Sequence, residues 1–138
     1  MAVTTALRRV VRRRLRGSLP HPPLRGAQLE LLQLVEAEPG TGVAAAARAL
    51  HLAGNSVSTL VNQLVTAGLL RRTVDPADRR AARLELTDAA LSRLAHWRRA
   101  RGELIGTALN RLPEADRTAV AAALPALRRL VDELEVAP

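Results

Sequence analysis

The amino-acid sequence predicts a mainly α-helical fold with one small two-stranded hairpin. Apolar residues recur at helical spacing through most of the 138 residues, whereas two short strand-like segments flank a turn at residues 75–78. The hydrophobic residues are almost all Leu, Ala and Val, and Trp97 is the one residue among Phe, Tyr and Trp. This composition suits packed helices better than a sheet sandwich, and the length fits a single domain.

An amphipathic helix is expected at the start of the chain, from Val3 to Gly17. Its apolar residues follow one another at helical spacing, and arginines surround them. A stiff pair of prolines then interrupts the chain. The next helix is expected over Gln28–Val35, before a Pro-Gly pair, and a short Ala-rich helix over Val43–Leu50.

The clearest amphipathic pattern follows a predicted turn at Gly54-Asn55-Ser56, in which Asn55 and Ser56 are both candidate N-caps. The apolar face of this helix consists of Val57, Leu60, Val61, Leu64 and Val65. The opposite face carries uncharged hydrogen-bonding side chains, namely Ser58, Thr59, Asn62, Gln63 and Thr66. Gly68 is expected to end the helix as the residue after its C-cap.

A hairpin is expected next, with strands over Leu69–Val74 and Ala82–Leu86. The residues between the strands have the chemistry of a turn and bear arginines. Thr87 is then expected to cap a long helix that reaches Asn110. A last helix opens at Pro113 and shows an apolar seam with heptad spacing, which suggests a partner helix. The seam consists of Val120, Leu124, Leu127, Val131 and Leu134, and Pro125 is expected to kink or split this helix.

The charge of the chain favours a nucleic-acid partner. The formal net charge is +8, and all 21 basic residues are Arg. Residues 1–29 hold seven arginines and no acidic residue, and residues 69–83 hold five arginines against two acidic residues. Such clusters suit phosphates, because each neutralised phosphate releases counterions. The absence of cysteine excludes disulfides and thiolate zinc sites, and no apolar run reaches the roughly 18 residues of a membrane span.

Residues 43–68 have the pattern of a helix-turn-helix, whose second helix lies in the major groove of DNA. There, Asn and Gln can pair with adenine through two hydrogen bonds, and Ser or Thr can contact any base edge. The hairpin has the position of a wing, and arginines at its tip suit the narrow minor groove. The candidate DNA contacts are Asn55, Ser56, Ser58, Thr59, Asn62, Gln63, Arg71, Arg72, Arg79, Arg80 and Arg83.

Four segments of the chain resemble regulators of the MarR family, namely residues 55–64, 67–72, 75–81 and 84–87. The Asp-Pro-x-Asp-Arg-Arg segment followed by Leu-x-Leu-Thr is the most specific of them. The resemblance covers about residues 24–90 by motif, and the order of helices extends it to the whole chain. The sequence departs from the family pattern at Arg25, Ala46, Thr59 and Ala90.

The resemblance implies a homodimer of single-domain chains. Residues 1–23 and 105–138 would form the dimerisation helices, residues 24–90 the winged helix-turn-helix and residues 87–110 a long connecting helix. The resemblance also implies that Arg80 enters the minor groove while Asp78 orients the wing. Such regulators usually repress transcription, and many release double-stranded DNA when a small-molecule effector binds. The two-fold symmetry of a dimer predicts a palindromic operator.

An enzyme is not expected, and neither a cofactor nor a metal site is expected. His21, His51 and His96 are scattered, and the sequence has no glycine-rich phosphate loop or nucleophile elbow. One alternative is a basic protein that associates with DNA regardless of sequence, or with membrane surfaces, through its first helix. Another is an activator, and the Arg-rich start also resembles a transit peptide. The family resemblance instead implies a bacterial cytoplasmic protein without membrane association.

Overall fold

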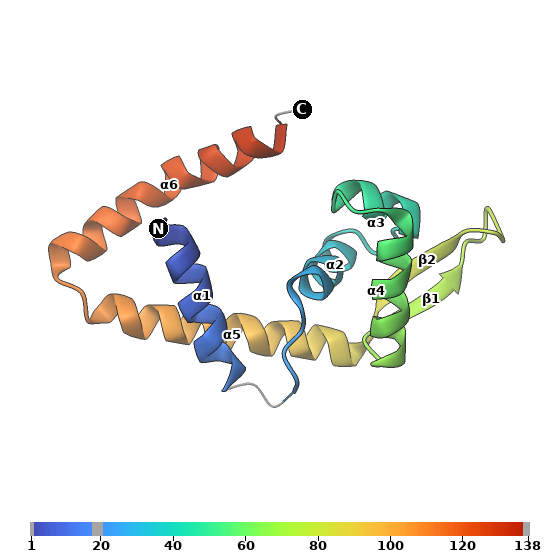
Figure 1. Ribbon diagram of the computed structural model, residues 1–138, viewed down its shortest axis with the longest axis horizontal. Coiled ribbons are helices and arrows are strands. Elements are labelled where there is room, and N and C mark those ends of the chain that lie inside the picture. Colours follow the sequence, from blue (N-terminus) through green and yellow to red (C-terminus); the bar gives the residue numbers. More distant parts are fainter. Residues whose placement is uncertain (1, 18–20, 137–138) are drawn as a thin grey trace.

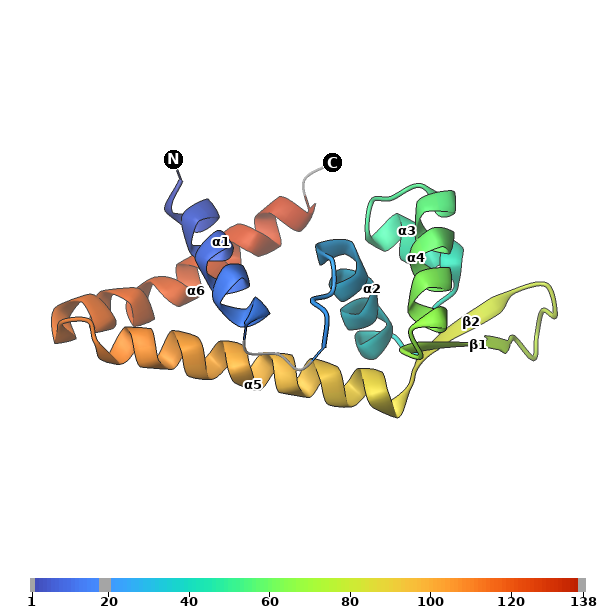
Figure 2. The same cartoon turned by 60° about the horizontal axis from the view of Figure 1, so that its bottom comes forward.

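A computed structural model of the protein describes residues 2–17 and 21–136. Its elements are α1 (Val3–Arg16), α2 (Gly26–Ala37), α3 (Val43–Ala49), α4 (Gly54–Thr66), β1 (Leu70–Val74), β2 (Ala82–Leu86), α5 (Asp88–Asn110) and α6 (Glu114–Val136). Figures 1 and 2 show α2, α3, α4 and the β1–β2 hairpin gathered at one end of the long α5, while α1 and α6 lie toward its other end. The mainly α-helical fold with one two-stranded hairpin is confirmed.

One apolar core joins α2, α3, α4, the hairpin and the first turns of α5. Its buried members are Leu31, Leu32, Val35, Ala46, Ala47, Val57, Val61, Leu64, Leu69, Leu70, Leu84, Ala90 and Leu94. Among the described residues, no polar or charged side chain is buried. The buried contacts that hold α4 in place are therefore apolar, and they leave its polar face outside.

The turn between α3 and α4 lies earlier than expected. His51 takes a left-handed backbone conformation with a φ of 52°, and the backbone N–H of Leu52 donates to the carbonyl oxygen of Ala47 at 2.9 Å. Ala53 then occupies the N-cap position without a side-chain capping bond. The prediction of a turn and side-chain caps at residues 54–56 is wrong, because the chain reverses before Gly54 and these residues already belong to α4.

The hairpin is tied to the rest of the domain at its base. Its strands pair antiparallel with Leu70 opposite Leu86, and Leu84 of β2 is fully buried in the core. The N–H of Leu84 donates to the carbonyl oxygen of Thr41, and the N–H of Gly40 donates to the carbonyl oxygen of Leu84, each at 2.9 Å. These two hydrogen bonds attach β2 to the segment between α2 and α3, and they fix the position at which the hairpin leaves the domain.

The long connecting helix α5 has the bounds that the sequence predicts. The side-chain oxygen of Thr87 accepts a hydrogen bond from the N–H of Ala90 at 3.2 Å and donates one to the carbonyl oxygen of Gly68 at 2.7 Å. Gly68 has a φ of 73° directly after α4, as expected of a glycine beyond a helix C-cap. Thr87 therefore links the end of α4 to the start of α5.

The terminal helices contribute little to the core. Leu15 of α1 is buried, whereas Val3 and Leu7 are more than half exposed. No residue of α6 is buried. The helix continues through Pro125, so the last helix is not split, because the proline ring already holds φ near its helical value. None of the helices in the described part of the chain has the length and apolar character needed to cross a membrane.

Candidate nucleic-acid interface

The outward face of α4 is polar and accessible. Val57, Val61 and Leu64 are buried on the inner side of the helix, so helical geometry turns the polar positions outward. The residues on this face that the sequence selects are Asn55, Ser56, Ser58, Thr59, Asn62 and Gln63, all exposed except for the half-buried Ser58. The hydroxyl of Thr59 donates to the carbonyl oxygen of Asn55 at 3.0 Å, so its proton is already used within α4.

Two amides on this face have partners on neighbouring elements. Nη2 of Arg72, on β1, donates to Oδ1 of Asn62 at 2.7 Å. Nε2 of Gln28, on α2, donates to Oε1 of Gln63 at 3.1 Å. The sequence analysis missed Gln28, although a Gln three residues after a helix N-cap occupies the glutamine position of a capping box. Its Oε1 does accept the backbone N–H of Arg25 at 2.9 Å.

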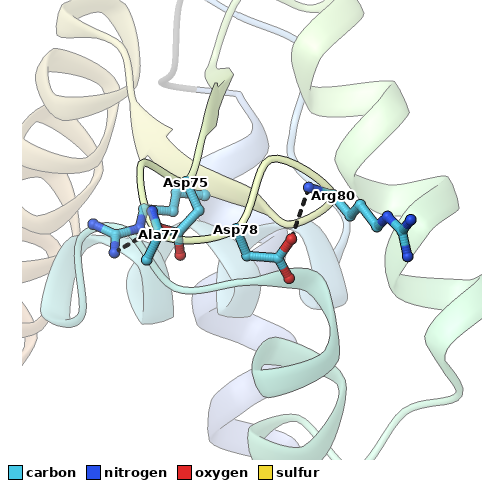
Figure 3. Close-up of polar contacts among 5 residues, drawn as sticks. Asp75, Ala77, Asp78 and Arg80 are labelled. Atoms are coloured by element: carbon cyan, nitrogen blue, oxygen red, sulfur yellow. Dashed lines mark hydrogen bonds and ion pairs between the residues drawn. The ribbon is translucent and has the colours of Figure 1, made fainter.

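The tip of the hairpin is shaped by two aspartates (Figure 3). Oδ1 of Asp75 accepts the N–H of Ala77, and Oδ1 of Asp78 accepts the N–H of Arg80, both at 2.9 Å. Both contacts span two residues, which is the pattern of Asx turns. The side chain of Arg80 extends away from the carboxylate of Asp78 (Figure 3), so Asp78 contacts the backbone of Arg80 and not its guanidinium group.

Apart from Arg72, which donates to Asn62, the arginines of the hairpin fall into two groups. Arg83 forms an ion pair with Asp75 at 3.1 Å. The N–H of Ala77 and the guanidinium of Arg83 hold the pKa of Asp75 below its ordinary value, so the ion pair is present at neutral pH. Arg71, Arg79 and Arg80 are exposed and make no ion pair with the described residues. They are the hairpin cations that remain available to an outside anion.

These features give a surface with two kinds of contact. A helix with an uncharged polar face has the width that the major groove admits, and its side chains can donate to or accept from base edges. The neighbouring loop offers exposed guanidinium groups, which bind phosphates or a narrow minor groove. The sequence-selected residues therefore lie on two adjoining elements, with Asn62 and Arg72 joining them by a hydrogen bond.

A separate cavity of about 750 Å³ lies between α1, α2 and α5. Its wall includes Leu7, Val11, Leu29 and Trp97. The guanidinium of Arg101 lies 4.4 Å from the centre of the Trp97 ring, within the range of a cation–π contact. The cavity is therefore mainly apolar, with positive charge at its border.

A model of the MarR family matches residues 23–81. The YusO protein from Bacillus subtilis is 21% identical, with a TM-score of 0.78 and coverage of 91% of this chain and 89% of YusO. A mutant of Staphylococcus aureus MepR bound to an oligodeoxyribonucleotide is 21% identical, with a TM-score of 0.71 and coverage of 94% and 92%. FabT of Streptococcus pneumoniae in complex with DNA is 19% identical, with a TM-score of 0.72 and coverage of 96% and 94%. No curated protein matches the chain in sequence. The resemblance drawn from the motifs is confirmed.

Proposed function

Since the chain has the fold of MarR-family regulators and its residues 23–81 match the family model, we propose that it is a sequence-specific DNA-binding transcription regulator and not an enzyme. The observation that carries this proposal is the exposed polar face of α4 beside a hairpin with free arginines. In the docked complex α4 lies in the major groove, and Arg80 enters the adjacent minor groove. Two similar proteins were crystallised with DNA, which supports the same use of this surface.

A homodimer is the proposed working form. The apolar seam of α6 is largely exposed in a single chain, with Leu124 at 58% and Leu134 at 68% of their full exposure. A second copy covers this seam and the outer side of α1 most simply, because both surfaces are present in each copy. Two recognition helices then meet one face of the duplex at half-sites about 10 base pairs apart, in a palindromic operator.

Repression and release by a small molecule complete the proposal. A dimer that occupies an operator within a promoter excludes the polymerase from it. The cavity between α1, α2 and α5 touches helices of both the dimerisation and the DNA-binding regions. An apolar effector with an acidic group fits its lining of leucines and arginines, and binding there changes how the two regions are joined.

The decisive experiment compares the two kinds of DNA contact. The operator is first selected from a random duplex library with the unaltered protein. Each variant is then titrated against the operator and a scrambled duplex at two salt concentrations. Arg80→Ala is expected to weaken both affinities and to lower the salt slope by about one unit. Asn62→Ala and Gln63→Ala are expected to reduce mainly the preference for the operator, by about 1–3 kcal/mol for a paired base contact.

Arg129→Ala is the matched control, because Arg129 is an exposed arginine on the side of α6 opposite the seam, away from α4 and the hairpin. It should leave both affinities as they are. Equal affinity of the unaltered protein for operator and scrambled DNA would favour the sequence-nonspecific alternative. If Arg80→Ala left a folded dimer with unchanged affinities, the hairpin would not be a DNA-binding wing.

A further inference from the structure

Gln28 links the start of α2 to the recognition face of α4. Its Oε1 accepts the backbone N–H of Arg25 at 2.9 Å, and its Nε2 donates to Oε1 of Gln63 at 3.1 Å. The side-chain nitrogen of Gln63 makes no hydrogen bond with the described residues. The amide of Gln63 is thus held by its oxygen alone.

The donors and acceptors in this series of hydrogen bonds can be assigned in only one way. A backbone N–H is always a donor, so the oxygen of Gln28 must be the atom that faces Arg25. The nitrogen of Gln28 then faces Gln63, and a nitrogen that carries two protons needs an acceptor there. The oxygen is the only acceptor on the side chain of Gln63. The backbone of α2 therefore determines which end of the Gln63 amide is free.

The side-chain amide of Asn62 also directs its oxygen toward a protein donor, but this donor lies on β1. The guanidinium of Arg72 carries donors only, and its Nη2 lies 2.7 Å from Oδ1 of Asn62. Asn62 and Gln63 therefore both direct their side-chain oxygens toward protein donors. Both keep their NH₂ groups for an outside acceptor.

We propose that Gln28 is a specificity-determining residue for the DNA sequence that α4 recognises, acting as a positioning residue on Gln63. With its oxygen held by Gln28, Gln63 acts as a hydrogen-bond donor to the base edge. The acceptors on base edges in the major groove are O6 and N7 of guanine, O4 of thymine and N7 of adenine, and of these bases only guanine and thymine present no donor beside the acceptor. Pairing with adenine through two bonds would require the Gln63 oxygen to accept from N6 as well, in competition with Gln28. This inference rests on the proposed DNA-binding function.

Gln28→Glu reverses the direction of the contact with almost no change of shape. The introduced carboxylate still accepts the N–H of Arg25, but it can only accept from Gln63. The amide of Gln63 then turns, and its oxygen faces the base edge. Binding sites selected from a random duplex library should change at one base pair in each half-site. The preference there should move from guanine or thymine toward a base with a donor, cytosine or adenine, by about five- to tenfold.

Two further variants separate orientation from charge and from folding. Gln33→Glu places the same charge on α2 at a residue that makes no hydrogen bond with the described part of α4, so it should keep the base preference of the unaltered protein. Gln28→Leu removes both contacts without adding charge, and it should broaden the preference at the same base pair. Thermal unfolding of each variant, followed by circular dichroism, identifies any loss of fold.

The outcomes distinguish this inference from the proposed function. If the unaltered protein selects no sequence, the proposed function fails. If it selects a sequence, but folded Gln28→Glu and Gln28→Leu variants select the same bases at every position, the positioning role of Gln28 is wrong. A change of preference that also occurs with Gln33→Glu would likewise overturn it, because charge alone would then be the cause.

Discussion

The winged-helix region, formed by α2, α3, α4 and the hairpin, differs from the terminal helices in how its apolar faces are covered. In the winged-helix region, Leu31 and Leu84 are completely buried within one chain. On α6, Leu127 keeps 51% and Leu134 keeps 68% of their full exposure. Yet α4 and α6 both carry apolar residues at helical spacing. Amphipathic spacing therefore predicts that a helix face is covered, but not whether the same chain or another chain covers it.

The largest expected effect comes from adding charge to the exposed seam. Leu127→Asp should abolish the dimer at micromolar concentration, because a carboxylate would be buried in the interface without a partner in each copy. Light scattering should then give the mass of one chain, while circular dichroism shows that the helices remain. Thr118→Asp is the control, since this residue lies on the opposite side of α6 from the seam and should leave the dimer intact. A dimer that persists in Leu127→Asp would show that α6 is not the interface.

A smaller effect is expected when the covered face of the winged-helix region is altered. Leu32 is fully buried in the core, so Leu32→Ala should lower the free energy of unfolding by about 2–5 kcal/mol through lost burial and a cavity. Urea unfolding at fixed protein concentration measures this loss. Dimer mass should remain unchanged in the folded variant. A loss below about 1 kcal/mol would mean that this region is less tightly packed than described.

The smallest effect concerns the ion pair between α2 and α5. Arg98 on α5 donates to both carboxylate oxygens of Glu36 on α2, and this contact lowers the pKa of Glu36 from its ordinary value. A lowered pKa stabilises the fold above the unfolded-state pKa, and the benefit is lost as the pH falls through the folded-state pKa.

Glu36→Gln should therefore cost about 0.5–1 kcal/mol at pH 7, a small value because the pair is partly exposed. The difference from the unaltered protein should shrink as the pH falls below about 4.5. Urea unfolding of both proteins at pH 7 and pH 3 measures this difference in the free energy of unfolding. Glu38→Gln, two residues further on and without an ion pair among the described residues, is the control. An equal cost at both pH values would contradict the role of the Glu36 charge.

Most of the fold follows from local patterns in the sequence. Apolar spacing located most of the helices, alanine content located α3, and Thr87 and Gly68 were identified at their caps. The start of α4 was misplaced because His51 adopts a positive φ, a conformation that residue type suggests for glycine and only weakly for histidine. Pro125 did not split α6, because proline disfavours a helix interior without forbidding it.

The candidate site was predictable in its residue types but not in its contacts. Helical geometry placed Asn62 and Gln63 on the outer face of α4, as the apolar spacing required. Their partners, Arg72 and Gln28, are 10 and 35 positions away, and their contacts depend on how β1 and α2 pack against α4. No local pattern contains that packing. The orientation of an amide group is therefore a property of the tertiary structure.

The position of Trp97 has a practical consequence. It is the only tryptophan of the chain, it lines the cavity between α1, α2 and α5, and Arg101 covers one face of its ring. A compound that enters the cavity would displace water or the guanidinium from the indole and so change the wavelength or intensity of its fluorescence. Each chain thus carries one intrinsic fluorophore at the cavity wall. Candidate compounds can be titrated against the unlabelled protein, and occupancy of the cavity followed directly by its emission.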